Sequence, residues 1–168
     1  MRKASFEDMN CSIARALEVI GEWWTLLILR DAFLGITRFE DWTERLGIAR
    51  NMLSTRLDTL VEAGVMDRQV YDQARDRADY VLTEKGRALW PVLVTIREWG
   101  DEWIFGEGTE PLLMQHRDCG EVTHPHLVCD KCGEKLHNRS FRNVPGPGFT
   151  EDWPYRAPDR TPRPKHTR

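Results

Sequence analysis

Residues 38–64 read RFEDWTERLGIARNMLSTRLDTLVEAG, and two helical patterns meet in this stretch at Gly47. Apolar side chains recur at the spacing of one helix face on both sides of the glycine: Phe39, Trp42 and Leu46 before it, and Leu53, Leu57 and Leu60 after it. Ile48 supplies an apolar side chain to the turn between them. A short amphipathic helix, a tight turn and a longer helix together predict a helix-turn-helix.

The polar side of the second helix of this motif faces away from the leucines. Arg and Asn side chains match the hydrogen-bonding edges of bases, and hydroxyl groups match phosphates. Small side chains near the helix N-terminus also allow a close approach to the major groove. The pattern therefore predicts that the helix contacts DNA through Arg50, Asn51, Ser54 and Thr55, with Arg56 at its flank.

After Gly64 the apolar period changes from helical to alternating. Residues 65–71 and 78–83 are predicted to form two strands joined by the polar turn DQARDR. A hairpin that directly follows a helix-turn-helix is a wing. Arg75 and Arg77 in its turn, and Arg38 before the motif, are predicted to contact phosphates.

Three further helices are expected around the motif. Ser12 is expected to cap a short helix that ends at Gly21, and residues 22–34 predict a mostly buried helix whose polar positions are Glu22, Thr25, Arg30 and Asp31. A third helix is expected from Glu84 to Phe105, with bends at Pro91 and Gly100. Its apolar, Trp-rich stripe exceeds what one small domain covers, which predicts a dimer.

Several separately placed segments, in order from Cys11 to about residue 103, resemble the HxlR-type winged helix-turn-helix transcription regulators: GEWWTLLILRDAFLG, TRFEDW, LGIARNMLSTRLDTLVEAGVMDRQVY, YVLTEKGRAL and REWG. The resemblance implies a homodimer that binds double-stranded DNA at a near-palindromic operator and represses transcription. It also implies that the recognition helix runs from Arg50 to Ala63 and the wing turn from Asp72 to Arg77. Two departures stand out, since the wing turn lacks a proline common in the family and residues 106–168 extend beyond the family core.

In some members of this family a cysteine near the position of Cys11 senses oxidants or electrophiles. Cys11 precedes a predicted helix N-terminus, a setting that lowers the pKa of a thiol. The alternative is an ordinary structural cysteine. A small-molecule or redox effector is therefore expected, and a pocket between the last helix and the domain body is the expected place for a small molecule.

Charge neither supports nor excludes this function. The net charge is −3, and residues 37–85 hold eight Lys/Arg against ten Asp/Glu. DNA binding then requires the acidic side chains to point away from the contacting face. Binding is predicted to be strongly sensitive to salt.

A second pattern, H-x2-C-x9-C-x2-C, lies in HRDCGEVTHPHLVCDKCG at residues 116–133. Paired ligands followed by glycines are typical of closed tetrahedral zinc sites, and the intervening residues are expected to form a short hairpin. The sequence predicts structural zinc held by His116, Cys119, Cys129 and Cys132. A redox dithiol of Cys129 and Cys132, or a ribbon that has lost its metal, are the alternatives, with His124, His126 and His137 as competing donors.

Overall, the sequence predicts a mainly α (α+β) chain in three parts. Residues 1–105 form a winged helix-turn-helix domain with a long C-terminal dimerisation helix, residues 106–144 a small zinc-ribbon-like module, and residues 145–168 a Pro-rich, flexible tail with six of the nine prolines. Without a signal peptide or apolar span, the expected location is cytoplasmic, with no membrane partner. A protein–protein interaction module with the ribbon as docking surface is the alternative function. A small zinc enzyme is disfavoured, because catalytic motifs are absent from the sequence.

Overall fold

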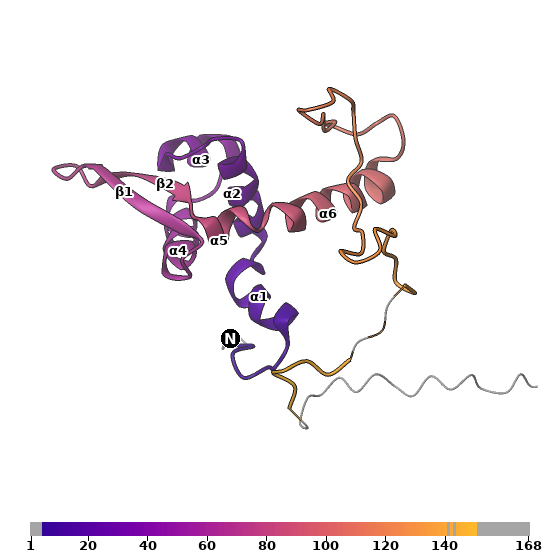
Figure 1. The fold of residues 1–168 in the computed structure, drawn as a ribbon. Coiled ribbons are helices and arrows are strands. Elements are labelled where there is room, and N and C mark those ends of the chain that lie inside the picture. Colours follow the sequence, from indigo (N-terminus) through magenta and orange to yellow (C-terminus); the bar gives the residue numbers. More distant parts are fainter. Residues whose placement is uncertain (1–4, 141, 143, 151–168) are drawn as a thin grey trace, which may run out of the picture.

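The computed structural model describes residues 5–140, 142 and 144–150. Its elements (Figure 1) are, in order, α1 (Ser12–Ile20), α2 (Trp23–Phe33), α3 (Phe39–Leu46), α4 (Arg50–Glu62), β1 (Met66–Asp72), β2 (Arg77–Leu82), α5 (Glu84–Arg87), α6 (Trp90–Gly100) and the π-helix η1 (Asp101–Phe105). None of the described helices is long and apolar enough to cross a membrane.

Helices α3 and α4 form the expected helix-turn-helix. Gly47 ends α3 in the left-handed conformation, with a φ of +62°, which a residue with a Cβ adopts only at a cost. The core behind the motif is completely shielded from solvent, and its members include Ile28, Leu29, Trp42, Leu53, Leu57 and Leu60. The periodicity of the leucines is therefore confirmed, and it fixes which side of α4 faces outward.

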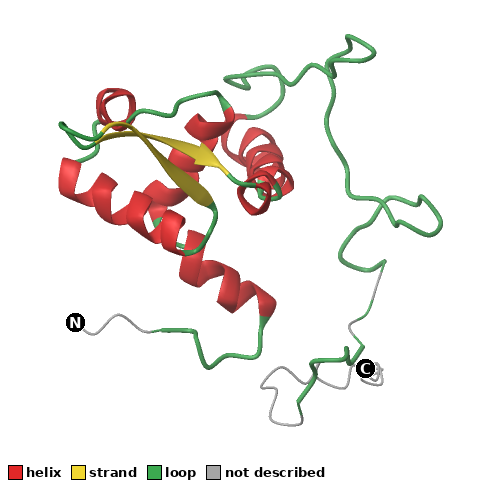
Figure 2. Cartoon of the chain, turned by 60° about the vertical axis from the view of Figure 1, so that its left-hand side comes forward, coloured by secondary structure: helices red, strands yellow, loops and turns green. Residues whose placement is uncertain are grey.

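Strands β1 and β2 form an antiparallel hairpin with Met66 opposite Leu82. The strands lie within one residue of their predicted ends. The chain before α3 adds a short third edge, since Tyr80 N donates to Thr37 O at 2.8 Å and Arg38 pairs with Asp79 in an isolated bridge. The wing is thus tied to the start of the helix-turn-helix, which fixes its position relative to α4. Figure 2 shows this hairpin against the helical body.

The chain leaves the wing through a tight contact. The Thr83 side chain caps α5 by accepting from Gly86 N at 3.1 Å, and it also approaches Gly64 O at 2.7 Å. Gly86 packs so closely that a Cβ there would lie 2.2 Å from Val65 O. This contact joins the end of the helix-turn-helix to the start of the C-terminal helices.

Two expectations about the flanking helices are wrong. Cys11, not Ser12, is the N-cap of α1, and it makes no side-chain capping bond. The helix expected from Glu84 to Phe105 is interrupted at Ala88 and Leu89, directly before the proline at the first turn of α6. Pro91 has no N–H to donate to the carbonyl four residues earlier, and its ring would clash with that carbonyl, so the hydrogen-bond ladder does not continue through this point. The C-terminal helix therefore runs from Trp90 into η1.

Thr25 and Asp31, expected on the polar surface of α2, are instead buried. The Asp31 carboxylate accepts from Arg30 Nε at 2.9 Å, and its other oxygen lies 3.5 Å from Arg45 Nε on α3. Within the described residues, that second oxygen has no hydrogen bond. The charge is compensated by two arginines, and it links α2 to α3.

Residues 106–150 form no helix or strand in the part that the structure describes. Isolated bridges join Gln115 to Val122 and Val128 to Lys135, so the chain makes two separate turns. The continuous zinc ribbon expected from the sequence is not formed. The end of this segment returns to the N-terminal arm, where Asn10 Nδ2 lies 2.9 Å from Gly148 O and 2.9 Å from Thr150 Oγ1. Most of the expected Pro-rich tail, residues 151–168, lies outside the described residues.

Candidate nucleic-acid interface

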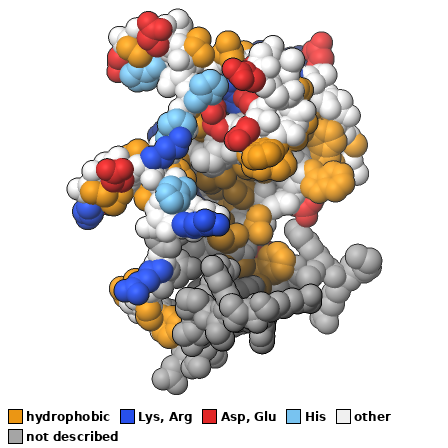
Figure 3. Space-filling view, turned by 90° about the vertical axis from the view of Figure 1, so that its right-hand side faces the viewer, with side chains coloured by type: hydrophobic (Ala, Val, Ile, Leu, Met, Phe, Trp, Pro, Cys, Tyr) orange, Lys and Arg blue, Asp and Glu red, His pale blue; other side chains and the backbone are white. Residues whose placement is uncertain are grey.

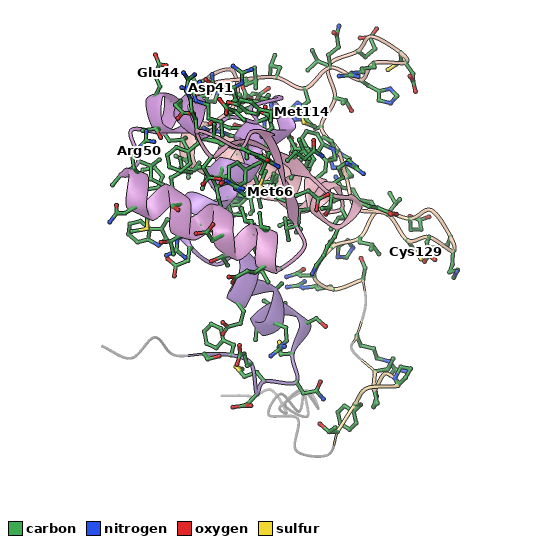
Figure 4. All side chains as sticks on the ribbon, turned by 90° about the vertical axis from the view of Figure 1, so that its left-hand side faces the viewer. Asp41, Glu44, Arg50, Met66, Met114 and Cys129 are labelled. Carbon is green, nitrogen blue, oxygen red and sulfur yellow. The ribbon has the colours of Figure 1, made fainter. Side chains whose placement is uncertain are left out.

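The outward side of α4 presents the side chains predicted to contact DNA. Arg50, Asn51, Ser54 and Thr55 are all exposed, whereas the leucines of the same helix are buried. Figure 4 shows Arg50 at the N-terminal end of α4, with Asp41 and Glu44 on α3. The structure therefore brings four of the predicted residues together on one helical face, which is narrow and polar.

Arg50 is held by its neighbours in α3. Its guanidinium carbon lies 4.7 Å from the centroid of the Phe39 ring, and its Nη2 lies 3.9 Å from Glu40 Oε1. The ring limits the conformations of the long side chain, which lowers the entropy lost on binding. Glu40, however, competes with a phosphate or a base for the same cation. Both side chains are about two-thirds exposed, so this ion pair is weak and readily exchanged.

The other polar groups of the face bond within the helix. Thr55 Oγ1 donates to Asn51 O at 2.9 Å, and Ser54 Oγ lies 3.4 Å from Asp58 Oδ2. Asn51 Oδ1 accepts from Met52 N at 2.9 Å. The carbonyl oxygen of the Asn51 amide is therefore occupied, and its N–H groups are the part that can donate to a base or a phosphate.

Arg56 lies away from this face. Its side chain is only 14% exposed, and its Nη1 lies 3.7 Å from Glu22 Oε1 at the start of α2. The Nε atom is buried and has no hydrogen-bond partner in the described residues. The structure thus places Arg56 between α4 and α2, and it separates this arginine from the other predicted contacts.

The wing turn exposes both of its predicted arginines, Arg75 and Arg77. Its shape depends on a third arginine that sequence reasoning missed. Arg68 Nη2 donates to Asp76 Oδ1 at 2.6 Å, and Asp76 has a φ of +50°. The hydrogen bond to Asp76, and a second to Tyr80, raise the pKa of Arg68. The sequence could have indicated this role of Arg68 through its position on β1, from which the side chain reaches the turn.

Arg38 is oriented by the base of the wing. Its guanidinium carbon lies 5.7 Å from the centroid of the Tyr71 ring, and its Nε lies 3.8 Å from Asp79 Oδ1. The side chain remains 61% exposed. Arg38 therefore lies between the helix-turn-helix and the wing, and a DNA backbone that crosses both elements would pass it.

A cavity of about 810 Å³ separates α2 from α6. Its walls are mainly apolar, with the side chains of Leu26, Phe33 and Trp90 among them. Residues of the C-terminal extension close one side, namely Pro111, Leu112, Met114 and Arg117. The position agrees with the pocket expected between the last helix and the domain body. The charged side chains that line it are Arg30, Arg45, Arg97, Arg117 and Asp101.

The Cys/His turns are the second cluster of functional side chains. His116 Nδ1 lies 3.3 Å from Cys119 Sγ in the first turn. In the second turn the backbone N–H groups of Cys132 and Lys131 donate to Cys129, which lowers the pKa of the Cys129 thiol. Among the described residues, no three potential ligands lie close enough together to share a metal ion. The structure therefore shows two pairs of predicted ligands and does not bring the pairs together.

The polar outward helix, the wing beside it and the buried helix-turn-helix core define a DNA-binding transcriptional regulator of the winged helix-turn-helix class. A family model described as HxlR-like helix-turn-helix matches residues 19–107. The chain belongs to this family of regulators, and not to a family of enzymes.

Relatives and solved structures agree with this assignment. An uncharacterized HTH-type transcriptional regulator of Mycobacterium tuberculosis, Rv3095, is 46% identical over 138 residues, which cover 82% of this chain and 87% of the relative. The crystal structure of PA1607, a candidate transcription factor, matches with a TM-score of 0.74 and 38% identity over 84% of this chain and 99% of that one. The redox regulator HypR, in its reduced form, matches with a TM-score of 0.50 and 32% identity over 54% of this chain and 90% of its own. Because the alignment with Rv3095 spans 138 residues and the family model ends at residue 107, that similarity continues into the C-terminal extension.

Proposed function

We propose that the chain is a homodimeric repressor that binds a near-palindromic operator. In this proposal α4 of each protomer enters the major groove, and the β1–β2 wing follows the neighbouring backbone. The observation that carries the proposal is the polar face of α4, where Arg50, Asn51, Ser54 and Thr55 are exposed beside buried leucines. Arg38, Arg75 and Arg77 lie on the adjoining elements and would supply phosphate contacts.

The exposed apolar side chains support the dimer. Trp23 is 89% exposed, and further large apolar side chains lie exposed on α1, α6 and η1: Ile13, Leu17, Ile96, Trp99, Trp103, Ile104 and Phe105. Hydrophobic side chains are visible on the face shown in Figure 3. Exposed apolar surface of this kind is unfavourable in water, and a second copy of the chain would cover it. A twofold dimer would present two α4 helices, which explains the expected symmetry of the operator.

Repression follows from the small size of such a dimer. Two winged domains on one operator would exclude other proteins from the DNA that they cover. The alternative, a protein–protein interaction module, would use the same surfaces without sequence-specific DNA contact. DNA selection distinguishes the two.

Selection of bound sequences from random duplex DNA is the direct test. We expect a twofold symmetric motif whose half-sites lie about one helical turn apart. Binding should weaken steeply as salt rises from low to physiological concentration, because phosphate contacts release counterions. Recovery of unrelated sequences, or of a single unrepeated half-site, would contradict the proposal.

Variants of α4 give the matched test. Asn51→Ala should lower affinity for the selected operator by roughly 5- to 100-fold, since a good base contact contributes about 1–3 kcal/mol. Glu62→Ala, at the exposed far end of the same helix, is the control and should change affinity little. Repression is then measured with a reporter gene behind the operator, where loss of the protein should raise expression.

An effector is part of the proposal. Cys11 is half-buried, and it lies at the N-terminal end of α1. The similarity to the redox regulator HypR supports a test of oxidant sensing. If Cys11 is the sensor, Cys11→Ser should abolish the change in operator binding that an oxidant causes. An unchanged response to oxidant in that variant would show that Cys11 is not the sensor.

A further inference from the structure

The two Cys/His turns have the same backbone hydrogen bonds. In the first, His116 N donates to Glu121 O at 2.9 Å, and Gly120 N donates to His116 O at 2.8 Å. In the second, the corresponding bonds run from Cys129 N to Glu134 O at 2.8 Å and from Gly133 N to Cys129 O at 2.9 Å. The structure thus contains the same turn twice, with a potential ligand at its first and fourth residues.

The glycine that follows each second ligand also matches. Gly120 and Gly133 both have a φ of +74°, a conformation that other residues adopt only with strain. Such a turn directs the side chains of its first and fourth residues toward the same point. Two ligands of one metal ion must converge in this way, and the turns have this backbone conformation without a metal.

The distance between the two potential ligands of the first turn fits zinc. Two ligands of one tetrahedral zinc, a nitrogen at about 2.0–2.1 Å and a sulfur at about 2.3 Å, lie about 3.5 Å apart. His116 Nδ1 and Cys119 Sγ are separated by 3.3 Å. In the other turn, backbone N–H groups point at Cys129 Sγ, as they do where a thiolate needs support from the protein.

The competing histidines have other partners. His124 Nδ1 lies 3.2 Å from Glu98 Oε2, His126 Nε2 lies 3.4 Å from Lys135 Nζ, and His137 Nδ1 accepts from Arg139 N at 3.3 Å. Among the histidines that the structure describes, His116 is the one whose ring nitrogen lies beside a cysteine sulfur. Its 57% exposed side chain also leaves it accessible to an ion from solvent.

From this geometry we propose that the two turns bind one Zn²⁺ between them, within one chain, through His116, Cys119, Cys129 and Cys132. This inference does not depend on the operator. The ion would join the two Cys/His turns, whose potential ligands do not meet in the described residues. Cys129 lies on a loop that projects from the helical body (Figure 4). Residues 121–128 would fold into the connecting hairpin. Each thiol gives up its proton to solvent on binding, and neutral His116 supplies the fourth donor.

The extension forms no buried apolar core of its own in the part that the structure describes. Five of its apolar side chains are more than half exposed: Leu112, Leu113, Val122, Leu127 and Val128. A segment without a core cannot offset the conformational entropy of ordering its chain. Coordination by four protein ligands supplies that free energy in small domains, where metal binding and folding occur together.

Metal analysis of the full-length protein tests the proposal. After expression with zinc and purification under reducing conditions, we expect one Zn²⁺ per chain, held without added metal. Loss of a group that hydrogen-bonds to a zinc ligand weakens metal binding by roughly 10- to 100-fold. Cys129→Ser and Cys132→Ser each remove a ligand itself, so each should weaken Zn²⁺ binding by more than that. His116→Ala should weaken it as well. The matched controls are Cys11→Ser, His124→Ala and His126→Ala, which should retain the full content.

A second measurement does not depend on how the variants fold. Wild-type protein reconstituted with Co²⁺ should show tetrahedral d–d bands and thiolate charge-transfer absorption of the strength expected for three sulfur ligands. The proposal would be overturned by any of three results: no thiolate absorption, half a metal ion per chain, or a loss of zinc in Cys11→Ser as large as in Cys129→Ser. Failure to bind DNA would leave the metal result unaffected, so this inference and the proposed function fail separately.

Discussion

Asp31 illustrates at the scale of one residue how a charge is accommodated in an apolar helix. Its side chain has no exposed surface, and its two oxygens lie beside Arg30 of the same helix and Arg45 of α3. A buried carboxylate that loses one partner is left with an uncompensated charge. The contact with Arg45 therefore makes the junction of α2 and α3 dependent on an arginine that is itself half-exposed.

Arg45→Ala should lower the free energy of unfolding by about 2 kcal/mol, because it leaves one Asp31 oxygen without a counter-charge. Chemical denaturation followed by circular dichroism measures the change. Arg75→Ala, an exposed wing arginine, serves as the control and should change stability by less than about 0.5 kcal/mol. In the Arg45→Ala background, Asp31→Asn should cost less than it does in wild type. Equal costs in both backgrounds would show that the two side chains do not interact.

Glu40→Gln should raise affinity for DNA. The carboxylate lies 3.9 Å from Arg50 and competes with phosphate for it, and its own charge repels the backbone. Because exposed ion pairs contribute up to about 1 kcal/mol, we expect a two- to fivefold gain, greatest at low salt. Fluorescence anisotropy with labelled operator measures it, and Glu62→Gln controls for the general effect of removing a negative charge. A decrease in affinity would mean that Glu40 orients Arg50 for binding.

Residue-level prediction from sequence succeeded where periodicity decides the outcome. The leucines of α4 are buried because their spacing places them on one face of the helix, and the exposure of Asn51 and Ser54 follows from the same spacing. Arg56 and Asp31 could not be placed this way. Their positions depend on Glu22 and Arg45, which lie on other helices, and a single sequence does not show which charged residues meet.

At the scale of elements, the close contact between α5 and the end of the helix-turn-helix holds the wing and the C-terminal helix together. Gly86 allows this contact because it has no Cβ, and its N–H is also the donor for the Thr83 cap. The obstacle to any larger residue is the carbonyl oxygen of Val65, which belongs to the backbone and cannot rotate away.

Gly86→Ala should destabilise the protein by about 2–3 kcal/mol, since the added methyl group would force α5 away from the Val65 carbonyl. A lower midpoint of thermal unfolding would report the change. Gly100→Ala is the matched control, because a Cβ there meets nothing within 4 Å and Gly100 is helical. That variant should be neutral or slightly stabilising. Similar midpoints for the two variants would argue against the contact.

The helices and strands from α1 to β2 could be predicted to within one or two residues, because their glycines and apolar periods are strong local signals. The break before Pro91 was expected only as a bend, since sequence does not show whether neighbouring turns compensate a missing N–H. The extension was least predictable. Its metal-ligand spacing predicts a ribbon, but its described backbone forms two separate turns whose potential ligands do not meet.

At the scale of the whole molecule, the winged domain and the extension meet along α6. Arg97 donates to Leu112 O, and His124 contacts Glu98 on the same helix. Residues 111–117 also close one side of the cavity between α2 and α6. The extension therefore lies against the helix proposed to join two protomers, while α4 and the wing are formed without it.

Removal of residues 111–168 should preserve operator recognition, because the described core of the winged domain contains no residue from this segment. We expect the truncated protein to select the same DNA motif, with affinity within about threefold of wild type. Sedimentation in parallel must confirm that it remains a dimer. Loss of specific binding by a folded, dimeric truncation would assign the extension a direct part in recognition.

The contact of Asn10 with Gly148 and Thr150 gives the extension a second anchor, far along the chain from its anchor on α6. A polymer segment fixed at both ends samples far fewer conformations than a free tail, so part of its ordering entropy is already lost. The described part of the extension between Leu112 and Gly148 is therefore a loop fixed at both ends. A tag or fusion partner that displaces Asn10 would release the tether, and the effect would appear more than a hundred residues away in sequence.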